Sequence, residues 1–281
     1  MAFLAFPNLN PVAFQVGPFA VRWYGLAYLT AFLAGWWILK KLDERWELGL
    51  GPDGRLSTVL AAVIGVIVGA RLGYVLFYNL SWYLANPAQI VATWDGGMSF
   101  HGGLAGILLA GVWVSRHYKV SFLRLCDVGA IAAPIGFLFG RLSNFVNGEL
   151  WGRATTLPWG VVFPQAPLVG GINVPRHPSQ IYEAILEGLV IFVVMVLLQR
   201  RKRPDGFLTG WLLTLYGIFR IFVEFFREPD IQVGFLPGGI TMGQLLSIPV
   251  LAAGIFLLWR AMRATRSPAA SDEPSTDEEG R

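Results

Sequence analysis

The chain has 281 residues, of which 54% are hydrophobic and 14% charged, and its formal net charge is +4. Soluble domains carry about 25% charged residues, so this composition argues against a soluble protein and indicates a polytopic membrane protein. The single cysteine, Cys126, excludes an internal disulfide framework and a cysteine-cluster metal site.

Seven apolar segments are each long enough to cross a hydrocarbon core of about 30 Å. In chain order they lie at residues 19–39, 57–78, 97–114, 126–146, 180–198, 207–226 and 242–259. The third segment is short and rich in glycine. The sequence therefore predicts an all-α integral membrane protein with about seven transmembrane helices, built as one polytopic membrane domain over residues 1–263.

Lysine and arginine are distributed unevenly between the connections of these segments. Connections 40–56, 115–125 and 199–206, together with the chain beyond residue 259, hold 15 of them, whereas the opposite connections hold four. Because cytoplasmic loops are enriched in Lys and Arg, we predict that the N-terminus is outside and the C-terminus cytoplasmic. Much of the basic charge then reports topology, so no nucleic-acid partner is expected.

Two further segments lie outside the apolar spans. The outer connection, residues 148–179, contains Pro, Gly and Trp without a clear period, and we predict that it forms a small extracytoplasmic cap. Residues 264–281 include SDEPSTDEEGR, which is acidic and lacks large apolar side chains, so we predict a disordered cytoplasmic tail.

Glycines recur four residues apart in three of the apolar segments. The three sets are Gly65, Gly69 and Gly73; Gly102 and Gly106; and Gly136 and Gly140. Small residues at this spacing let membrane helices approach closely, so we predict helix–helix contacts at these positions.

Three arginines lie inside the spans: Arg71, Arg141 and Arg220. Each is 13 to 15 residues from the inner end of its span, which places all three about 20–22 Å from the inner boundary. An arginine at mid-membrane costs at least about 2.5 kcal/mol. For any one of them, an ion pair with a carboxylate or snorkelling to the interface is at least as good an interpretation. Three at one depth favour a shared anion site.

Two stretches bring further polar groups to that depth. In TLYGIFRIFVEFFR, residues Tyr216, Arg220 and Glu224 are spaced four apart and share one helix face, where an Arg220–Glu224 ion pair is the simpler interpretation. In GRLSNFVNGELWG, Asn144 shares a face with Arg141, whereas Asn147 and Glu149 lie at or past the helix end. An Asn near a helix end often serves only as a cap.

Tyr24 and two histidines lie at the outer ends of other segments. His101 has glycines on both sides in WDGGMSFHGG, which leaves room for a ligand, and His177 lies in RHPSQIYE. A single His is more often a hydrogen-bonded packing residue than a catalyst. Because the three histidines of the chain are on separate segments without a zinc-binding spacing, no metal and no cofactor is predicted.

These residues together predict an outward-facing pocket that is rich in arginine, with histidine and carboxylates beside it. The natural anion at that depth is a phospholipid head group in the outer leaflet, because the guanidinium group binds phosphate through two parallel hydrogen bonds.

Six stretches of the chain, in order, resemble bacterial prolipoprotein diacylglyceryl transferases: WYGLAY, GARLGYVLFYN, WDGGMSFHGG, GRLSNFVNGELWG, RHPSQIYE and YGIFRIFVEFFREPD. The resemblance runs from about Phe19 to Arg260, and the one departure noted is Ser143 where the family usually has Gly. It implies a seven-span enzyme of the bacterial inner (cytoplasmic) membrane. Its important residues carry over to Tyr24, His101, Arg141, Asn144, Glu149, Tyr216, Arg220 and Glu224.

The resemblance also implies a reaction. The family transfers diacylglycerol from phosphatidylglycerol to the thiol of a lipobox cysteine in a prolipoprotein, forms a thioether and releases glycerol phosphate. The expected partners are thus phosphatidylglycerol, the prolipoprotein signal peptide and the lipid bilayer. The attacking thiol comes from the substrate, because Cys126 lies at the inner end of its span, at the wrong depth for a nucleophile.

The resulting site hypothesis divides the residues into two groups. The catalytic group is His101, Arg141, Arg220, Glu149 and Glu224. The phospholipid-binding group is Arg141, Arg220, Tyr24, Asn144, Tyr216, Arg71 and His177. We favour His101 as general base, since an imidazole suits proton transfer near neutral pH, and Glu149 and Glu224 are the alternatives.

Two other functions are compatible with the composition. A transporter or flippase for an anionic lipid or solute would also need buried arginines, but its polar groups should continue toward the cytoplasmic half of the spans. A non-catalytic partner in lipoprotein sorting is the second alternative, which the set of motifs disfavours.

Overall fold

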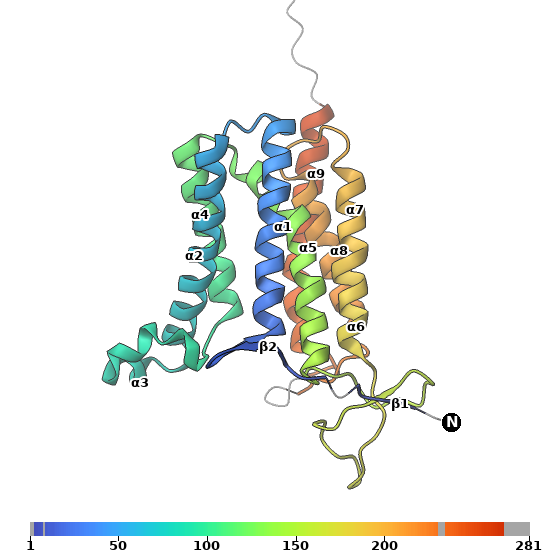
Figure 1. Ribbon diagram of the computed structural model, residues 1–281. Helices are drawn as coiled ribbons and strands as arrows, with labels where there is room; N and C mark the ends of the chain where they lie inside the picture. Colours follow the sequence, from blue (N-terminus) through green and yellow to red (C-terminus); the bar gives the residue numbers. More distant parts are fainter. Residues whose placement is uncertain (1–2, 8, 230–233, 267–281) are drawn as a thin grey trace, which may run out of the picture.

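The computed structural model describes residues 3–7, 9–229 and 234–266. Seven long helical segments run side by side in this part of the chain (Figure 1). They are α1 (Trp23–Trp46), α2 (Gly51–Tyr78), α4 (Phe100–Tyr118), α5 (Phe122–Val146), the continuous α6 (Ser179–Glu183), η3 (Ala184–Val190) and α7 (Ile191–Leu198), α8 (Phe207–Val223) and α9 (Met242–Arg266).

Four of these segments are long and apolar enough to cross a membrane: Gly51–Tyr78, Phe122–Val146, Ser179–Leu198 and Met242–Ala264. The helix Phe207–Val223 is also apolar but shorter. The chain is therefore a largely helical, multi-pass membrane protein.

The N-terminal residues do not follow the all-α prediction. Strands β2 (Val12–Val16) and β3 (Phe19–Arg22) form an antiparallel hairpin, and β1 (Leu4–Ala5) pairs in parallel with β4 (Val161–Val162). The first helix thus begins at Trp23 rather than at residue 19. The reason is local: two runs rich in β-branched and aromatic residues flank a Gly-Pro turn, which favours a hairpin over a helix.

Other boundaries shift by a few residues. Three short helices, α3 (Leu80–Ala85), η1 (Pro87–Val91) and η2 (Thr93–Asp95), precede the third long helix. That helix begins at Phe100 rather than at residue 97, because the Ser99 hydroxyl caps it by accepting a hydrogen bond from the Gly102 amide at 3.2 Å. The predicted tail, residues 264–281, lies outside the described residues except for 264–266, which continue α9.

Close glycine contacts join α2 to α4. A Cβ added to Gly69 or Gly106 would collide with backbone atoms of the opposite helix, and one added to Gly73 would come within 2.7 Å of the Gly102 Cα. The glycine prediction is confirmed for this pair of helices. In α5 it holds at Gly136, where an added Cβ would contact Ala31 of α1 at 3.4 Å, and is wrong at Gly140, where an added Cβ would meet nothing within 4 Å.

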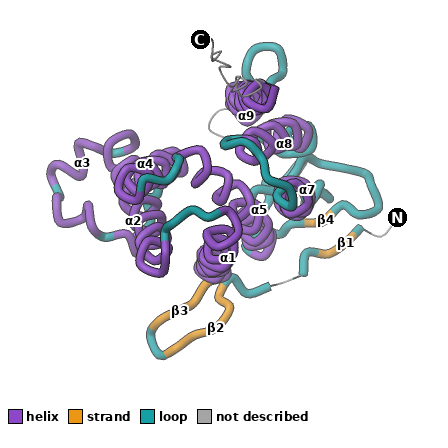
Figure 2. The backbone as a smooth tube through the Cα atoms, turned by 90° about the horizontal axis from the view of Figure 1, so that it is seen from above, coloured by secondary structure: helices purple, strands orange, loops and turns teal. Residues whose placement is uncertain are grey.

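The helices pack as neighbouring pairs, with α2 beside α4, α1 beside α5 and α8 beside α9 (Figure 2). The short strands, α3 and the 148–179 loop gather at one end of the bundle, and α9 ends at the other (Figure 1). We call these the cap end and the tail end.

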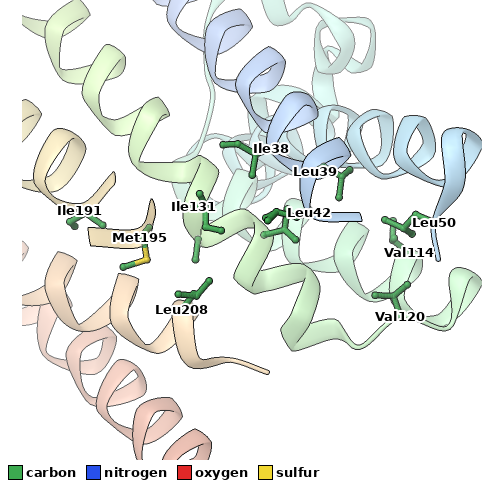
Figure 3. Close-up of a cluster of buried hydrophobic side chains, with 12 residues drawn as sticks. Ile38, Leu39, Leu42, Leu50, Val114, Val120, Ile131, Ile191, Met195 and Leu208 are labelled. Atoms are coloured by element: carbon green, nitrogen blue, oxygen red, sulfur yellow. The ribbon is translucent and has the colours of Figure 1, made fainter. Parts of the chain in front are cut away.

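An apolar core joins the helices toward the tail end (Figure 3). It includes Ile38 and Leu42 of α1, Ile131 of α5, Met195 of α7 and Leu208 of α8.

The start of α8 is fixed at the same end by buried Asp127 of α5. This carboxylate accepts hydrogen bonds from the backbone amides of Gly206 and Thr209, both at 2.8 Å. The polar groups of the cap-end half are thus carried on helices that are locked together at the tail end.

Candidate active site

The carboxylate of Glu149 is the centre of a first polar cluster at the cap end. Its Oε1 accepts hydrogen bonds from the Tyr24 hydroxyl at 2.5 Å, from Asn144 Nδ2 at 3.0 Å and from Asn147 Nδ2 at 3.4 Å. Asn144 also donates to the Tyr24 hydroxyl. We call Tyr24, Asn144, Asn147 and Glu149 the Glu149 cluster.

Backbone contacts hold Glu149 in place. Its amide donates to the Asn144 carbonyl at 3.1 Å, and its own carbonyl accepts a hydrogen bond from Gln180 Nε2 at 2.5 Å. Because Gln180 belongs to α6, the turn after α5 is fixed to the next long helix. The two asparagines, which a helix cap could also have explained, both have side chains that donate to this carboxylate.

A second cluster joins three arginines to three glutamates. Glu183 lies at its centre, where its Oε1 pairs with Arg220 and with Arg227 Nη1 at 3.1 Å, and its Oε2 lies 3.2 Å from Arg141 Nε. We call the set Arg141, Arg220, Arg227, Glu183, Glu187 and Glu224 the Arg–Glu cluster.

The other two carboxylates complete this cluster. Glu224 Oε1 lies 2.6 Å from Arg220 Nη2, and its Oε2 accepts a hydrogen bond from the Thr241 hydroxyl at 2.6 Å. Glu187 lies farther from its partners, with 3.6 Å to Arg141 Nη2 and 3.9 Å to Arg220 Nη1.

Close backbone contacts place these carboxylates. Glu187 lies in the π-helical turn η3, and a Cβ added to the neighbouring Gly188 would come within 2.7 Å of the Leu138 Cα of α5. The glycine thus lets η3 approach the helix that carries Arg141. Single π-turns of this kind are frequent at functional sites.

The shared-anion hypothesis is correct in bringing Arg141 and Arg220 together but omits their counter-charges. Both guanidinium groups pair with Glu183, which is completely buried, so the described cluster has as many carboxylates as arginines. The Arg220–Glu224 ion pair, the simpler interpretation of their spacing, is confirmed.

Arg141 differs from Arg220 in its free hydrogen-bonding capacity. Arg220 donates a hydrogen bond to Glu183 and forms an ion pair with Glu224 at 2.6 Å. Arg141 has ion-pair contacts but donates no hydrogen bond to any residue that the structure describes, and at 20% its side chain is the most exposed of the three arginines. Its donors remain available to an oxygen-rich ligand.

Arg71 does not join this cluster through any described contact. Its guanidinium group donates to five backbone carbonyls, those of Gln89, Ile90, Ala92, Gly96 and Gly97. The side chain is buried beneath the segment between α3 and α4, with Tyr83 packed on it at 5.2 Å. Arg71 therefore anchors the loop that leads to His101.

His101 is the second residue of α4 and has an exposed side chain. Its ring contacts Phe100, with 5.6 Å between centroids, and makes no hydrogen bond among the described residues. The structure thus leaves the imidazole open, and no described contact joins it to either cluster.

The His177 side chain has no described contact with Arg141 or Arg220 and lies in the wall of an apolar groove of about 380 Å³. Its Nδ1 is 3.2 Å from the Tyr182 hydroxyl and its ring packs on Phe226. Burial, and secondarily the positive charge of Arg153, lower the pKa of His177, which favours the neutral ring. Tyr216 packs on Phe137 at 5.4 Å, on the same face of α8 as Arg220.

A family model described as Prolipoprotein diacylglyceryl transferase matches residues 11–260. The chain belongs to this family. A phosphatidylglycerol–prolipoprotein diacylglyceryl transferase of Geobacter sulfurreducens is 50% identical over 252 residues, which are 90% of this chain and 95% of the relative. The enzyme of the same name from Rhodospirillum centenum is 49% identical over 276 residues, 96% and 99% of the two chains.

Sequence reasoning about this diacylglyceryl transferase family member missed the carboxylates that balance the arginines. The sequence alone predicted no role for Glu183, Glu187 or Arg227. A usable signal was present, because Glu183 and Glu187 are four residues apart and two apolar helices nearby carry arginines. No group of three or more His, Cys, Asp or Glu that could hold a metal ion occurs within the described ranges.

Proposed function

We propose that the protein transfers the diacylglyceryl group of phosphatidylglycerol to the lipobox cysteine of a prolipoprotein. The observation that carries this proposal is the convergence, in a chain of this family, of side chains from four separate segments in two adjoining polar clusters. Tyr24 comes from α1, Arg141 and Asn144 from α5, Glu183 from α6, and Arg220 from α8.

The reaction replaces one bond with another. The cysteine sulfur attacks the phosphate-bearing carbon of the acylated glycerol, not that of the head-group glycerol. A C–S bond forms there, and the bond between this carbon and the phosphate oxygen breaks. Glycerol phosphate leaves with the bonding electrons, and the thiol proton passes to a base. Negative charge on the phosphate grows along this path, so fixed guanidinium donors stabilise the transition state more than the substrate.

Arg141 and Arg220 are the residues that we propose for the phosphate. Arg141 offers unused donors, whereas Glu183 and Glu224 hold the Arg220 guanidinium group in one orientation. A fixed arginine loses little entropy when it binds, and an open one supplies the parallel N–H groups that phosphate oxygens accept. Tyr24, Asn144 and Tyr216 are proposed to line the lipid head group, as the family motifs imply.

His101 is the base that we propose. A thiol near neutral pH needs a proton acceptor, because a free cysteine has a pKa of about 8.5. The two alternatives already accept hydrogen bonds: Glu149 from Tyr24, and Glu224 from Thr241. His101 makes none with the described residues, and its ring is exposed at the start of α4. This exposure supports the His101 imidazole as the group that accepts the thiol proton.

The membrane arrangement is part of the proposal. We propose seven transmembrane helices with the N-terminus outside, so that the cap end and both clusters face the outer leaflet of the bacterial inner membrane. The supporting observation is the distribution of Lys and Arg, which favours the connections on the tail-end side.

The transporter alternative gains no support. Its path would need polar groups along the whole bundle, whereas the described tail-end half is occupied by a large apolar core.

A reconstituted transfer assay tests the function. Purified protein is mixed with phosphatidylglycerol and a lipobox peptide, and mass spectrometry follows the peptide. We expect a diacylglyceryl adduct on the cysteine and an equal amount of released glycerol phosphate. An unmodified peptide, with the lipid moved between vesicle leaflets instead, would contradict the proposal and favour a flippase.

A further inference from the structure

Glu187 differs from the other two carboxylates of the Arg–Glu cluster in its hydrogen bonding. It is 1% exposed, and neither of its side-chain oxygens accepts a hydrogen bond from the described residues. Its closest guanidinium nitrogen lies at 3.6 Å, on Arg141. A buried carboxylate anion without hydrogen bonds is strongly disfavoured.

Glu183 and Glu187 are close neighbours on one helical segment. Side chains four residues apart lie on the same helix face, and Glu183 Oε2 is a further buried oxygen without a hydrogen bond in the described structure. Both carboxylates contact the guanidinium groups of Arg141 and Arg220. Two carboxylates in one buried site repel each other when both are ionised, and this repulsion favours keeping one proton on the pair. The ionisable groups that face Glu187 are Arg141 from α5, Arg220 and Tyr216 from α8, Arg227 after α8, and Glu183 on its own segment.

We propose that Glu183 and Glu187 share one proton in the resting protein, so that the Arg–Glu cluster carries a net charge of +1. Three guanidinium groups then face two negative charges, one on Glu224 and one on the Glu183–Glu187 pair. An anion can approach this unbalanced positive charge at Arg141, whose side chain is the most exposed of the three arginines. The shared proton does not depend on the proposed function. Only the role of the +1 charge, which is to balance the single negative charge of a phosphodiester, rests on it.

The shared proton sets the affinity of the site for an anion. A cluster with every carboxylate ionised would be neutral and would give a phosphodiester no net attraction. With the proton in place, binding one phosphodiester brings the cluster to neutrality inside the bundle, where an unbalanced charge is costly. Glu187 is thus a positioning residue that acts through the arginines.

Infrared spectroscopy of the full-length protein without substrate tests the proton directly. At neutral pH we expect the carbonyl band of a protonated carboxylic acid in the wild type. The band should disappear in both Glu187→Gln and Glu183→Gln, because removing either partner lets the other ionise. The matched control is Glu228→Gln, which removes a half-exposed carboxylate paired with Arg176 and should keep the band. An unchanged band in both cluster variants would overturn the proposal.

Lipid binding gives a second readout. Short-chain phosphatidylglycerol is titrated into the detergent-solubilised protein, and we expect the dissociation constant of Glu187→Gln to stay within about threefold of the wild type, since glutamine mimics the neutral acid. If Glu187 were ionised, its removal would add one net positive charge and tighten binding by about tenfold or more. Such tightening, or a loss of binding, would overturn the proposal. Because the infrared result needs no substrate, it stands even if the transfer reaction is not observed.

Discussion

The guanidinium group of Arg71 donates hydrogen bonds to five backbone carbonyls, whereas that of Arg141 donates none to the described residues. Both arginines lie in apolar helices, and sequence alone gives them the same weight. Their different surroundings assign Arg71 to the anchoring of a loop and leave Arg141 free to bind an anion.

Arg71→Lys should therefore make residues 89–97 open more often, with a smaller effect on the stability of the helix bundle. An ammonium group has three donors and cannot reach five carbonyls, and each lost hydrogen bond from a charged donor costs about 1.5–3 kcal/mol. We expect faster amide hydrogen exchange in residues 89–97, measured by mass spectrometry. Arg116→Lys, at an exposed position on α4, is the control. Equal exchange rates in the two variants would show that the five contacts do not anchor the loop.

His101→Gln tests the base. If the imidazole takes the thiol proton, turnover should fall by about 10²–10⁴-fold at neutral pH. The deficit should shrink as the pH rises past the thiol's own pKa of about 8.5, because preformed thiolate needs no base. A pH–rate profile of transfer measures this. A deficit that stays constant between neutral and alkaline pH would assign the proton to Glu149 or Glu224 instead.

Glycine contacts let the neighbouring helices α2 and α4 pack with their backbones touching. On α2 and α4, backbone meets backbone at Gly69, Gly102 and Gly106, which brings the helix carrying His101 against the helix carrying Arg71. A substitution at this interface should therefore act on both stability and loop geometry.

Gly106→Ala should destabilise the α2–α4 pair, since its methyl group would collide with the Gly65 carbonyl. Overpacking of this kind costs about 1–3 kcal/mol, and a lower thermal midpoint in detergent would report it. Gly129→Ala on α5 is the matched control, because a Cβ there meets nothing within 4 Å. Equal midpoints for the two variants would refute the close approach.

The sequence predicted most of the elements because apolar length and glycine spacing are local properties. The long helices, the positions of close packing at the glycines of α2 and α4, and the Arg220–Glu224 pair all follow from spacing along one segment, whereas the choice of helix partner does not. Contacts between segments did not follow: the strand pair β1–β4 joins residues more than 150 positions apart. The same limit hid the partners of Arg141, because Glu183 reaches it from another helix.

At the scale of the whole molecule, the cap end and the tail end have different compositions. Polar clusters and a loop-rich cap occupy one end, and the apolar core and the basic connections the other. This polarity supports chemistry at one membrane surface, with the opposite half of the bundle serving to hold the helices.

Labelling with a membrane-impermeant thiol reagent tests that arrangement. In a Cys126→Ser background, cysteines at Asn86 and Gln165, both exposed at the cap end, should react from outside intact cells. A cysteine at Lys202, exposed in the connection before α8, should react only after the membrane is opened. The reverse pattern would place the clusters at the cytoplasmic surface and rule out an outer-leaflet site.

If guanidinium donors in the Arg–Glu cluster bind the departing phosphate, transfer must depend on the shape of the Arg141 side chain as well as on its charge, and Arg141→Lys separates the two. Lysine keeps the positive charge but loses the parallel N–H pair, so the variant should fold and insert while its rate of diacylglyceryl transfer from phosphatidylglycerol to a lipobox peptide falls at least about 100-fold. Arg116→Lys should retain the wild-type rate. Wild-type turnover by Arg141→Lys would show that the phosphate does not need the Arg141 guanidinium group.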